Sequence, residues 1–159
     1  MSAWYSHLQA KELALLKLSF GLKNGMEKSS GGCLCKAVRF TFETVEKEHH
    51  VCHCNMCRKW AGSSMMATAT KGIQFENESK VSRFDSSDFA QRGFCKECGS
   101  NLFYYYKPQD LYMVCVGAFD DPSQFKLIGE IFVDSQPKGY SFAGDLKRKT
   151  EEEFLAEFS

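Results

Sequence analysis

Eight cysteines in a chain of 159 residues are the feature that most restricts the fold. Seven of them fall in three short groups: Cys33 and Cys35, then Cys52, Cys54 and Cys57, then Cys95 and Cys98. Cysteines separated by one or two residues let a single turn of backbone present two thiolates to one metal ion. The spacing therefore predicts metal thiolates rather than disulfide bridges. The amino-terminal sequence has no signal-peptide pattern, so we expect a reducing, cytoplasmic location.

Four sulfurs close a tetrahedral zinc site, so seven clustered cysteines divide most simply into a set of four and a set of three. Joining the first pair to the last gives a closed site of Cys33, Cys35, Cys95 and Cys98. The remaining Cys52, Cys54 and Cys57 would leave one position of a second zinc open, as a catalytic zinc requires. Two alternatives stay open. The first pair could instead join Cys54 and Cys57, or both sites could be closed, with His53, Cys115 or a carboxylate as the eighth ligand.

The histidines and basic residues near the second group are expected to have supporting roles. His53 lies between two cysteines, and in an extended segment its side chain would point away from theirs, towards a packing or supporting contact. His49 and His50 are expected in a solvated turn. Arg58 and Lys59 directly follow Cys57, where they could offset the charge of a three-thiolate site or bind a substrate carboxylate.

Cys115 and the aspartates of a later turn are expected to have structural roles. Cys115 lies inside an apolar stretch, where a cysteine usually packs as a small buried hydrophobe. Asp120 and Asp121 precede a proline and are expected to form a turn.

The body of the chain is predicted to be mostly antiparallel β. Val38, Phe40 and Phe42 alternate with polar residues, which is typical of a half-buried strand. Further segments rich in β-branched and aromatic residues predict strands over 65–70, 81–84, 102–106, 111–116 and 130–133.

Three regions are expected along the chain. Residues 1–25 have leucines at helical spacing and read as a helical extension, or as an added segment or the product of an upstream start. Residues 26–147 form the zinc-binding domain. Residues 148–159 end in a short helix, which a capping box of Thr150 and Glu153 would begin.

Composition and motifs exclude several other classes of protein. Twenty basic and twenty acidic residues with no basic run argue against a nucleic-acid partner. The longest apolar segment, residues 13–22, is interrupted by Lys17 and Ser19 and is too short to span a membrane. Nucleophile-elbow, dinucleotide-binding, phosphate-loop and zinc-deaminase motifs are absent. The metal thiolates are therefore the only chemical motif that the sequence offers.

The cysteine groups stand in a longer pattern that resembles the glutathione-dependent formaldehyde-activating enzyme family, which also contains centromere protein V. The resemblance runs from about Gly31 to Asp145. It rests on Gly31-Gly32-Cys33-Leu34-Cys35 with Ala37-Val38-Arg39-Phe40, Cys52-His53-Cys54 with Cys57-Arg58-Lys59, Phe94-Cys95 to Cys98-Gly99-Ser100 with Leu102-Phe103, Val116 to Pro122, and Ile131-Phe132-Val133 with Pro137.

The resemblance implies a β-tent fold of antiparallel sheets that holds two zinc ions per chain. Cys33, Cys35, Cys95 and Cys98 match the structural site of the family, and Cys52, Cys54 and Cys57 match its catalytic site. The implied activity is that of a carbon–sulfur lyase, which condenses formaldehyde with the small thiol glutathione to S-hydroxymethylglutathione.

The sequence departs from the family pattern at three places. Lys36 replaces a usual glycine, Glu130 replaces a common histidine, and Gly139-Tyr140 replaces a region that typically contains tryptophan. These departures leave the identity of the substrate open. Two other functions are also kept open: a zinc hydrolase of an imine-like molecule on the same scaffold, and a non-catalytic zinc-binding interaction module.

Overall fold

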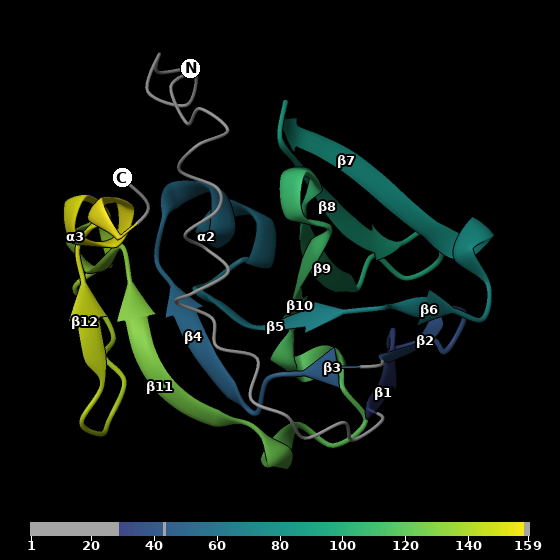
Figure 1. The fold of residues 1–159 in the computed structure, drawn as a ribbon, viewed down its shortest axis with the longest axis horizontal. Helices are drawn as coiled ribbons and strands as arrows, with labels where there is room; N and C mark the ends of the chain where they lie inside the picture. Colours follow the sequence, from purple (N-terminus) through teal and green to yellow (C-terminus); the bar gives the residue numbers. More distant parts are fainter. Residues whose placement is uncertain (1–28, 43, 158–159) are drawn as a thin grey trace.

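The computed structural model describes residues 29–42 and 44–157, which form a mainly β fold of two sheets (Figure 1). The helical extension expected over residues 1–25 lies outside the described residues. The smaller sheet has the order β1-β2-β6 and is antiparallel throughout. Its strands are β1 (Ser29–Gly32), β2 (Arg39–Phe42) and β6 (Gln74–Phe75).

The larger sheet has the order β12-β11-β4-β5-β10-β9-β8-β7, and β3 also pairs with β5. Its strands are β3 (Thr44–Val45), β4 (Glu48–Cys52), β5 (Met65–Lys71), β7 (Val81–Ser87), β8 (Ala90–Cys95), β9 (Asn101–Tyr106), β10 (Leu111–Cys115), β11 (Lys126–Ile131) and β12 (Lys147–Lys149). Most neighbours are antiparallel, as expected, but β11 pairs in parallel with both β4 and β12.

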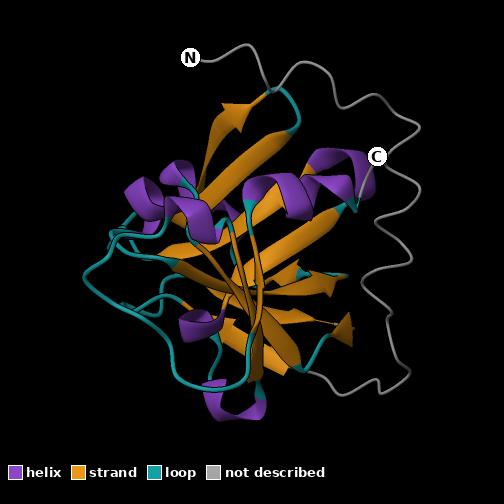
Figure 2. Ribbon diagram, turned by 90° about the vertical axis from the view of Figure 1, so that its left-hand side faces the viewer, coloured by secondary structure: helices purple, strands orange, loops and turns teal. Residues whose placement is uncertain are grey.

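Short helices lie around the strands (Figure 2). The α-helices of the described residues are α2 (Asn55–Ala61) and α3 (Glu151–Ala156), and both lie beyond the carboxyl ends of the parallel strands β4, β11 and β12 (Figure 1). The expected capping box is present, because Thr150 and Glu153 bond each other's backbone N–H groups at the start of α3. Single 3-10 turns complete the described elements: η3 (Glu78–Lys80), η4 (Lys107–Gln109), η5 (Val116–Ala118), η6 (Pro122–Gln124) and η7 (Val133–Ser135). None of the helices in the described ranges has the length and apolar character needed to cross a bilayer.

Alternate side chains of β2 are buried, as the sequence predicts. Phe40 and Phe42 are buried while Thr41 between them is exposed, because successive side chains of a strand point to opposite faces. These two phenylalanines belong to the larger core cluster, which also contains Leu102, Phe103 and Phe119. A second, smaller cluster of Cys57, Met65 and Ala67 lies between α2 and β5.

The expected solvated turn at His49 and His50 is wrong. Both histidines lie within β4, between β5 and β11, and His49 is buried. Burial disfavours the imidazolium form, so it lowers the pKa of both side chains. The strand begins at Glu48, and its charged and polar residues obscure the period of two on which a prediction of strand would depend.

Candidate metal centres and pocket

Cys33, Cys35, Cys95 and Cys98 form one cluster, with their four sulfur atoms all within 4.8 Å of one another. The Sγ atoms of Cys33 and Cys35 are 3.5 Å apart, and those of Cys35 and Cys95 are 3.8 Å apart. Four sulfurs that share a zinc at about 2.3 Å would lie about 3.8 Å from one another, so this donor set fits a tetrahedral zinc. The backbone N–H of Val38 also donates to Cys33 Sγ at 3.2 Å, a contact that favours the thiolate.

The turns that carry these cysteines need left-handed backbone. Gly99 follows Cys98 with φ at 72°, and Lys36 follows Cys35 with φ at 66°. A side chain at such a φ is strained by about 1–2 kcal/mol, so the backbone at position 36 favours glycine.

The four-cysteine cluster joins the two sheets. Cys33 and Cys35 follow β1 of the smaller sheet, whereas Cys95 ends β8 of the larger sheet. A second link is the ion pair between Arg39 of β2 and Asp120, with an Nη2–Oδ2 distance of 2.5 Å. This Arg39 contact and a hydrogen bond from Ser30 lower the pKa of Asp120 to about 2. Asp121 has the expected role in a turn, since its carboxylate accepts the N–H of Ser123 at the start of η6.

Cys52, Cys54 and Cys57 form the other cluster, again with all sulfurs within 4.8 Å. Cys52 ends β4, Cys54 caps the amino terminus of α2, and Cys57 lies in its first turn. Cys54 Sγ accepts the N–H of Cys57 at 3.4 Å. Hydrogen bonds from the side chains of Cys52 and Cys57 and from backbone N–H groups lower the pKa of Cys54 to about 2. The neighbouring thiols, and after them the backbone N–H groups at the start of α2, therefore favour a thiolate at Cys54, the form that binds zinc.

Within the described residues, no fourth histidine, cysteine or carboxylate joins this cluster. His53 is fully buried, and both of its ring nitrogens are engaged elsewhere: Nδ1 with the hydroxyl of Tyr140 at 3.0 Å and Nε2 with Glu130 Oε2 at 2.8 Å. Cys115 packs against both core clusters, and desolvation raises the pKa of its thiol to about 12. Neither of the two residues considered as an eighth ligand takes that position.

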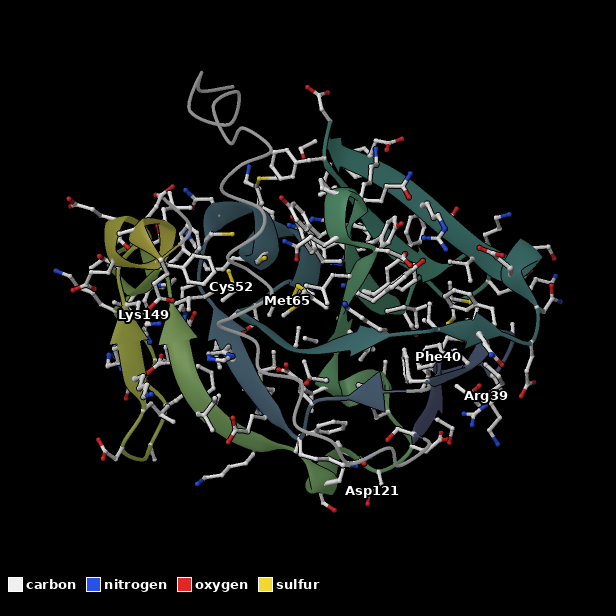
Figure 3. All side chains as sticks on the ribbon, viewed as in Figure 1. Arg39, Phe40, Cys52, Met65, Asp121 and Lys149 are labelled. Atoms are coloured by element: carbon white, nitrogen blue, oxygen red, sulfur yellow. The ribbon has the colours of Figure 1, made fainter. Side chains whose placement is uncertain are left out.

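Arg92 also belongs to this centre, although no local sequence pattern indicates it. It comes from β8, is only 4% exposed, and directs Nη2 to Cys57 Sγ at 3.6 Å. The guanidinium also lies over the rings of Trp60 and Tyr104, at 5.8 and 5.3 Å from the ring centroids. A buried cation beside a thiolate offsets the net negative charge of a zinc bound by three thiolates. Figure 3 shows Cys52 and Met65, on the neighbouring strands β4 and β5, at this part of the fold.

A closed ring of hydrogen bonds begins at His53. Glu130 contacts His53 and also pairs with Arg148 at 2.5 Å, and Arg148 donates to Gln136 Oε1 at 2.7 Å. Gln136 in turn donates to the backbone oxygen of Tyr140, whose hydroxyl contacts His53. Glu130 is completely buried, so both carboxylate oxygens need these partners. The ring fixes the segment that follows η7 against the segment between Cys52 and Cys54.

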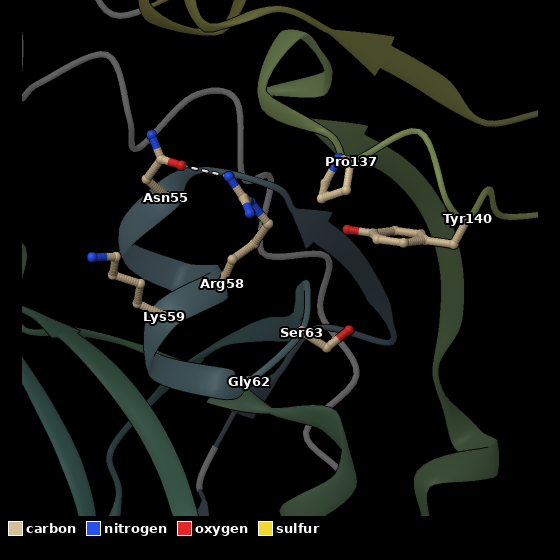
Figure 4. Close-up of a pocket in the computed structure, with 7 residues that line it drawn as sticks. All are labelled: Asn55, Arg58, Lys59, Gly62, Ser63, Pro137 and Tyr140. Atoms are coloured by element: carbon tan, nitrogen blue, oxygen red, sulfur yellow. Dashed lines mark hydrogen bonds between the residues drawn. The ribbon is translucent and has the colours of Figure 1, made fainter.

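A pocket of about 290 Å³ opens beside α2. Figure 4 shows Arg58 and Lys59 on the helix and Tyr140 across from them, with its hydroxyl directed towards the helix. Arg58 is held in place by donating Nε to the backbone oxygen of His53 at 2.9 Å and Nη2 to Asn55 Oδ1. The other lining residues are Gly62, Ser63 and Pro137. The pocket thus contains both basic residues that the sequence selected and adds Tyr140, which it did not.

Comparison with known proteins now places the chain. The sequence model of the family described as glutathione-dependent formaldehyde-activating enzyme matches residues 28–135. The chain belongs to this family. An uncharacterized lyase of Schizosaccharomyces pombe, C29B12.13, is 30% identical over 132 residues, which are 82% of this chain and 96% of the relative. A putative glutathione-dependent formaldehyde-activating enzyme of Podospora anserina is 33% identical over 95 residues, or 54% of this chain and 45% of the relative.

A solved structure has a similar fold. The crystal structure of a Rhodobacter sphaeroides protein superposes with a TM-score of 0.51 at 17% identity, covering 76% of this chain and 99% of that one. Together with the two cysteine clusters, family membership confirms the fold class that the sequence predicts. The names of the relatives support an enzyme of the lyase type.

Proposed function

We propose that the chain is a zinc-dependent carbon–sulfur lyase that joins glutathione to formaldehyde as S-hydroxymethylglutathione. The observation that carries the proposal is the difference between the two clusters. One has four sulfurs and would hold a structural zinc. The other has three sulfurs, and no fourth ligand joins it among the residues that the structure describes. A metal centre with a free position is suited to bind and release a small reactant. Asn55 and Arg58, which directly follow Cys54 and Cys57, line the pocket on the same helix.

In this proposal the two zinc ions have separate roles. Cys33, Cys35, Cys95 and Cys98 hold the sheets together, and Cys52, Cys54 and Cys57 form the reactive centre. A zinc ion at three thiolates supplies a Lewis-acidic position that favours the thiolate form of a thiol or polarises a carbonyl group. The reaction is an addition without any further reactant. The sulfur electron pair forms the new carbon–sulfur bond, the carbonyl π pair moves to oxygen, and a proton equivalent to the one lost by the thiol is gained there.

The chain's own residues would bind and orient the thiol compound. Arg58 and Lys59 line the pocket and offer N–H donors to a carboxylate of glutathione. Arg58 is already fixed by two hydrogen bonds, so less side-chain entropy is lost when it binds an anion. On the buried side, Arg92 keeps the charge of the three-thiolate centre balanced. Because the centre needs free thiolates and the substrate is a reduced thiol, we place the protein in the reducing cytosol.

The proposal is tested by magnetisation-transfer NMR with ¹³C-formaldehyde and glutathione at equilibrium. The addition also proceeds without an enzyme, so the exchange rate is compared with a protein-free sample. The zinc-loaded protein should increase the exchange rate in proportion to its concentration. Cys54→Ser should abolish that increase, while Cys115→Ser, which changes a thiol outside both clusters, should retain it. An exchange rate that does not depend on the zinc-loaded protein would refute the proposed activity.

A further inference from the structure

The two edges of the larger sheet differ in how well they are protected (Figure 1). One edge, β12, has only three residues, and all of them are basic. Short, lysine-bearing edge strands resist pairing with another chain. The other edge, β7, has seven residues and carries Phe84, which is 58% exposed. Among the residues that the structure describes, β7 pairs with β8 alone, so its outer side presents a row of backbone N–H and C=O groups to a further strand.

The sequence of β7 around Phe84 is self-complementary. Arg83 precedes Phe84, Asp85 follows it, and Ser82 and Ser86 lie one position further out. When two copies of β7 pair antiparallel with Phe84 at the two-fold axis, each Arg83 faces the second copy's Asp85, and the two phenylalanines face each other. Opposite charges and aromatic rings directly across a strand pair stabilise it. A symmetric dimer requires such a self-complementary patch.

Both charged side chains have groups available for a second chain. Lys107 Nζ and Gln91 Nε2 both donate to Oδ1 of Asp85, at 2.7 and 3.1 Å, so Oδ2 can accept from another partner. The Asp85 side chain is 67% exposed. Arg83 donates one N–H, at Nη2, to Glu78 at 3.0 Å, and a guanidinium has four others. Each side chain can therefore form a further ion pair without giving up its present contacts.

The same two side chains are already held in place. The Arg83 guanidinium lies 5.0 Å from the ring centroid of Phe103 and also lies over three other rings, those of Phe75, Tyr105 and Tyr112. A side chain that is fixed beforehand loses less entropy when it binds. Arg83 and Asp85 are two positions apart, so they extend from one face of the strand and Phe84 extends from the other. The edge thus offers a charged side and an apolar side.

A bulge in β7 determines the length of the interface. The pairing with β8 shifts register between Asp85 and Ser87. A bulge bends the strand and interrupts regular pairing. The regular part around Phe84 therefore provides one aromatic pair and two pairs of Arg83 with Asp85. Such a short interface predicts a reversible dimer whose population depends on the protein concentration.

We propose that two copies of the chain form a symmetric dimer by antiparallel pairing of their β7 edges, with Phe84 at the two-fold axis. Each Arg83 binds the second copy's Asp85, and the two larger sheets become one continuous sheet. The pairing covers the exposed Phe84 and the outer side of β7 together, whereas β12 stays at the outside of the assembly. The inference does not depend on the proposed catalytic activity.

Sedimentation velocity of the zinc-loaded full chain over a series of concentrations tests the inference. The wild-type protein should change from monomer to dimer as its concentration rises towards about 1 mM. Arg83→Glu places a carboxylate opposite Asp85, and Asp85→Lys places an ammonium group opposite Arg83. Like charges directly opposite each other destabilise a strand pair, so each variant alone should dimerise at least about tenfold more weakly.

An equimolar mixture of these two variants is the decisive sample. In the mixed dimer, the introduced carboxylate of one chain faces the introduced ammonium group of the other, and the native Arg83 faces the native Asp85. The mixture should therefore regain the dimer at the wild-type affinity. A loss of folding cannot produce this recovery, because both chains must present an intact β7.

Lys147→Glu is the matched control, because it reverses a charge on β12 at the other edge of the sheet. It should dimerise like the wild type. A wild-type protein that stays monomeric up to about 1 mM, a dimer that persists in both single variants, or a mixture of folded variants that stays monomeric would each overturn the inference.

Phe84→Asp decides the question if circular dichroism shows that Arg83→Glu does not fold. It changes an exposed side chain and places two carboxylates at the two-fold axis. This variant should dimerise at least about tenfold more weakly than the wild type. A dimer of wild-type affinity in Phe84→Asp would overturn the inference.

Discussion

Replacing Arg92 by methionine should weaken zinc binding at the three-cysteine cluster and leave the four-cysteine cluster unchanged. Arg92 Nη2 lies 3.6 Å from Cys57 Sγ and the side chain is 4% exposed. At that distance, opposite unit charges attract by about 5 kcal/mol with an effective dielectric constant of about 20. Desolvation of both groups opposes this attraction, and a charge-assisted hydrogen bond contributes about 1.5–3 kcal/mol net. A loss of about 2 kcal/mol corresponds to zinc affinity weakened about 30-fold.

The assay is stepwise removal of zinc by a chromogenic chelator, which reports two affinities for the two clusters. Methionine has an apolar side chain of similar length, so it fills the space between Trp60 and Tyr104 without leaving a large cavity. Arg83→Met is the control, because Arg83 also lies over aromatic rings but pairs with Glu78 rather than a thiolate. If Arg92→Met and Arg83→Met released zinc with the same affinities, the charge-balancing role of Arg92 would be refuted.

Three more changes test other parts of the account. Cys95→Ser should lose one zinc and the cooperative unfolding transition, since Cys95 is fully buried where the sheets join, whereas Cys54→Ser should lose the other zinc and keep the fold. Zinc analysis and circular dichroism measure both properties, and two folded variants would contradict the prediction. Lys36→Gly should stabilise the zinc-loaded protein by up to about 1 kcal/mol, because glycine adopts the left-handed φ without strain, and Lys36→Val should destabilise it by about 1 kcal/mol, because a β-branched residue is the most strained there. A glycine variant with a lower denaturation midpoint would be the opposite result. Burial, and to a smaller extent the charge of Glu48, raises the pKa of Glu46 from 4.5 to about 7. Between these pH values the folded protein keeps a proton that the unfolded chain has lost, so this carboxyl lowers the free energy of unfolding increasingly as pH rises from about 4.5 to 7. Glu46→Gln should therefore have a higher free energy of unfolding than the wild type at pH 8, by about 1 kcal/mol after allowance for partial exposure, with a smaller difference at pH 5.5. Denaturation measured at both pH values checks this, and a constant difference would show that the carboxyl does not titrate in this way.

The sequence predicts the cysteine groups well because ligand spacing is a local property. One turn of backbone sets the distance between Cys95 and Cys98, and nothing distant is needed to recognise it. Which groups share a metal depends on topology, however, and spacing alone left two partitions open. In the fold, the turn after β1 lies next to the end of β8, so the first cysteine pair is grouped with the last pair.

Other parts of the site depend on contacts across many residues. Tyr140 meets His53 across 87 positions, and Arg92 meets Cys57 across 35, so no local pattern indicates either contact. Glu130 gave one usable signal, because a carboxylate at the start of an apolar segment needs a partner if the strand is buried. β11 pairs in parallel with β4, and this pairing brings Glu130 close to His53. The alternating patterns that predicted the strands do not indicate which strands pair in parallel.

The central claim is that the cluster of Cys52, Cys54 and Cys57 binds a metal with one position open to a thiol. Cadmium-113 NMR of the cadmium-substituted protein tests it most directly, because the resonance frequency reports how many sulfurs bind each ion. We expect two resonances, one typical of four sulfurs and one of three. Added glutathione should move only the three-sulfur resonance towards the four-sulfur position. Two four-sulfur resonances before glutathione is added, or a three-sulfur resonance that glutathione leaves in place, would contradict the account.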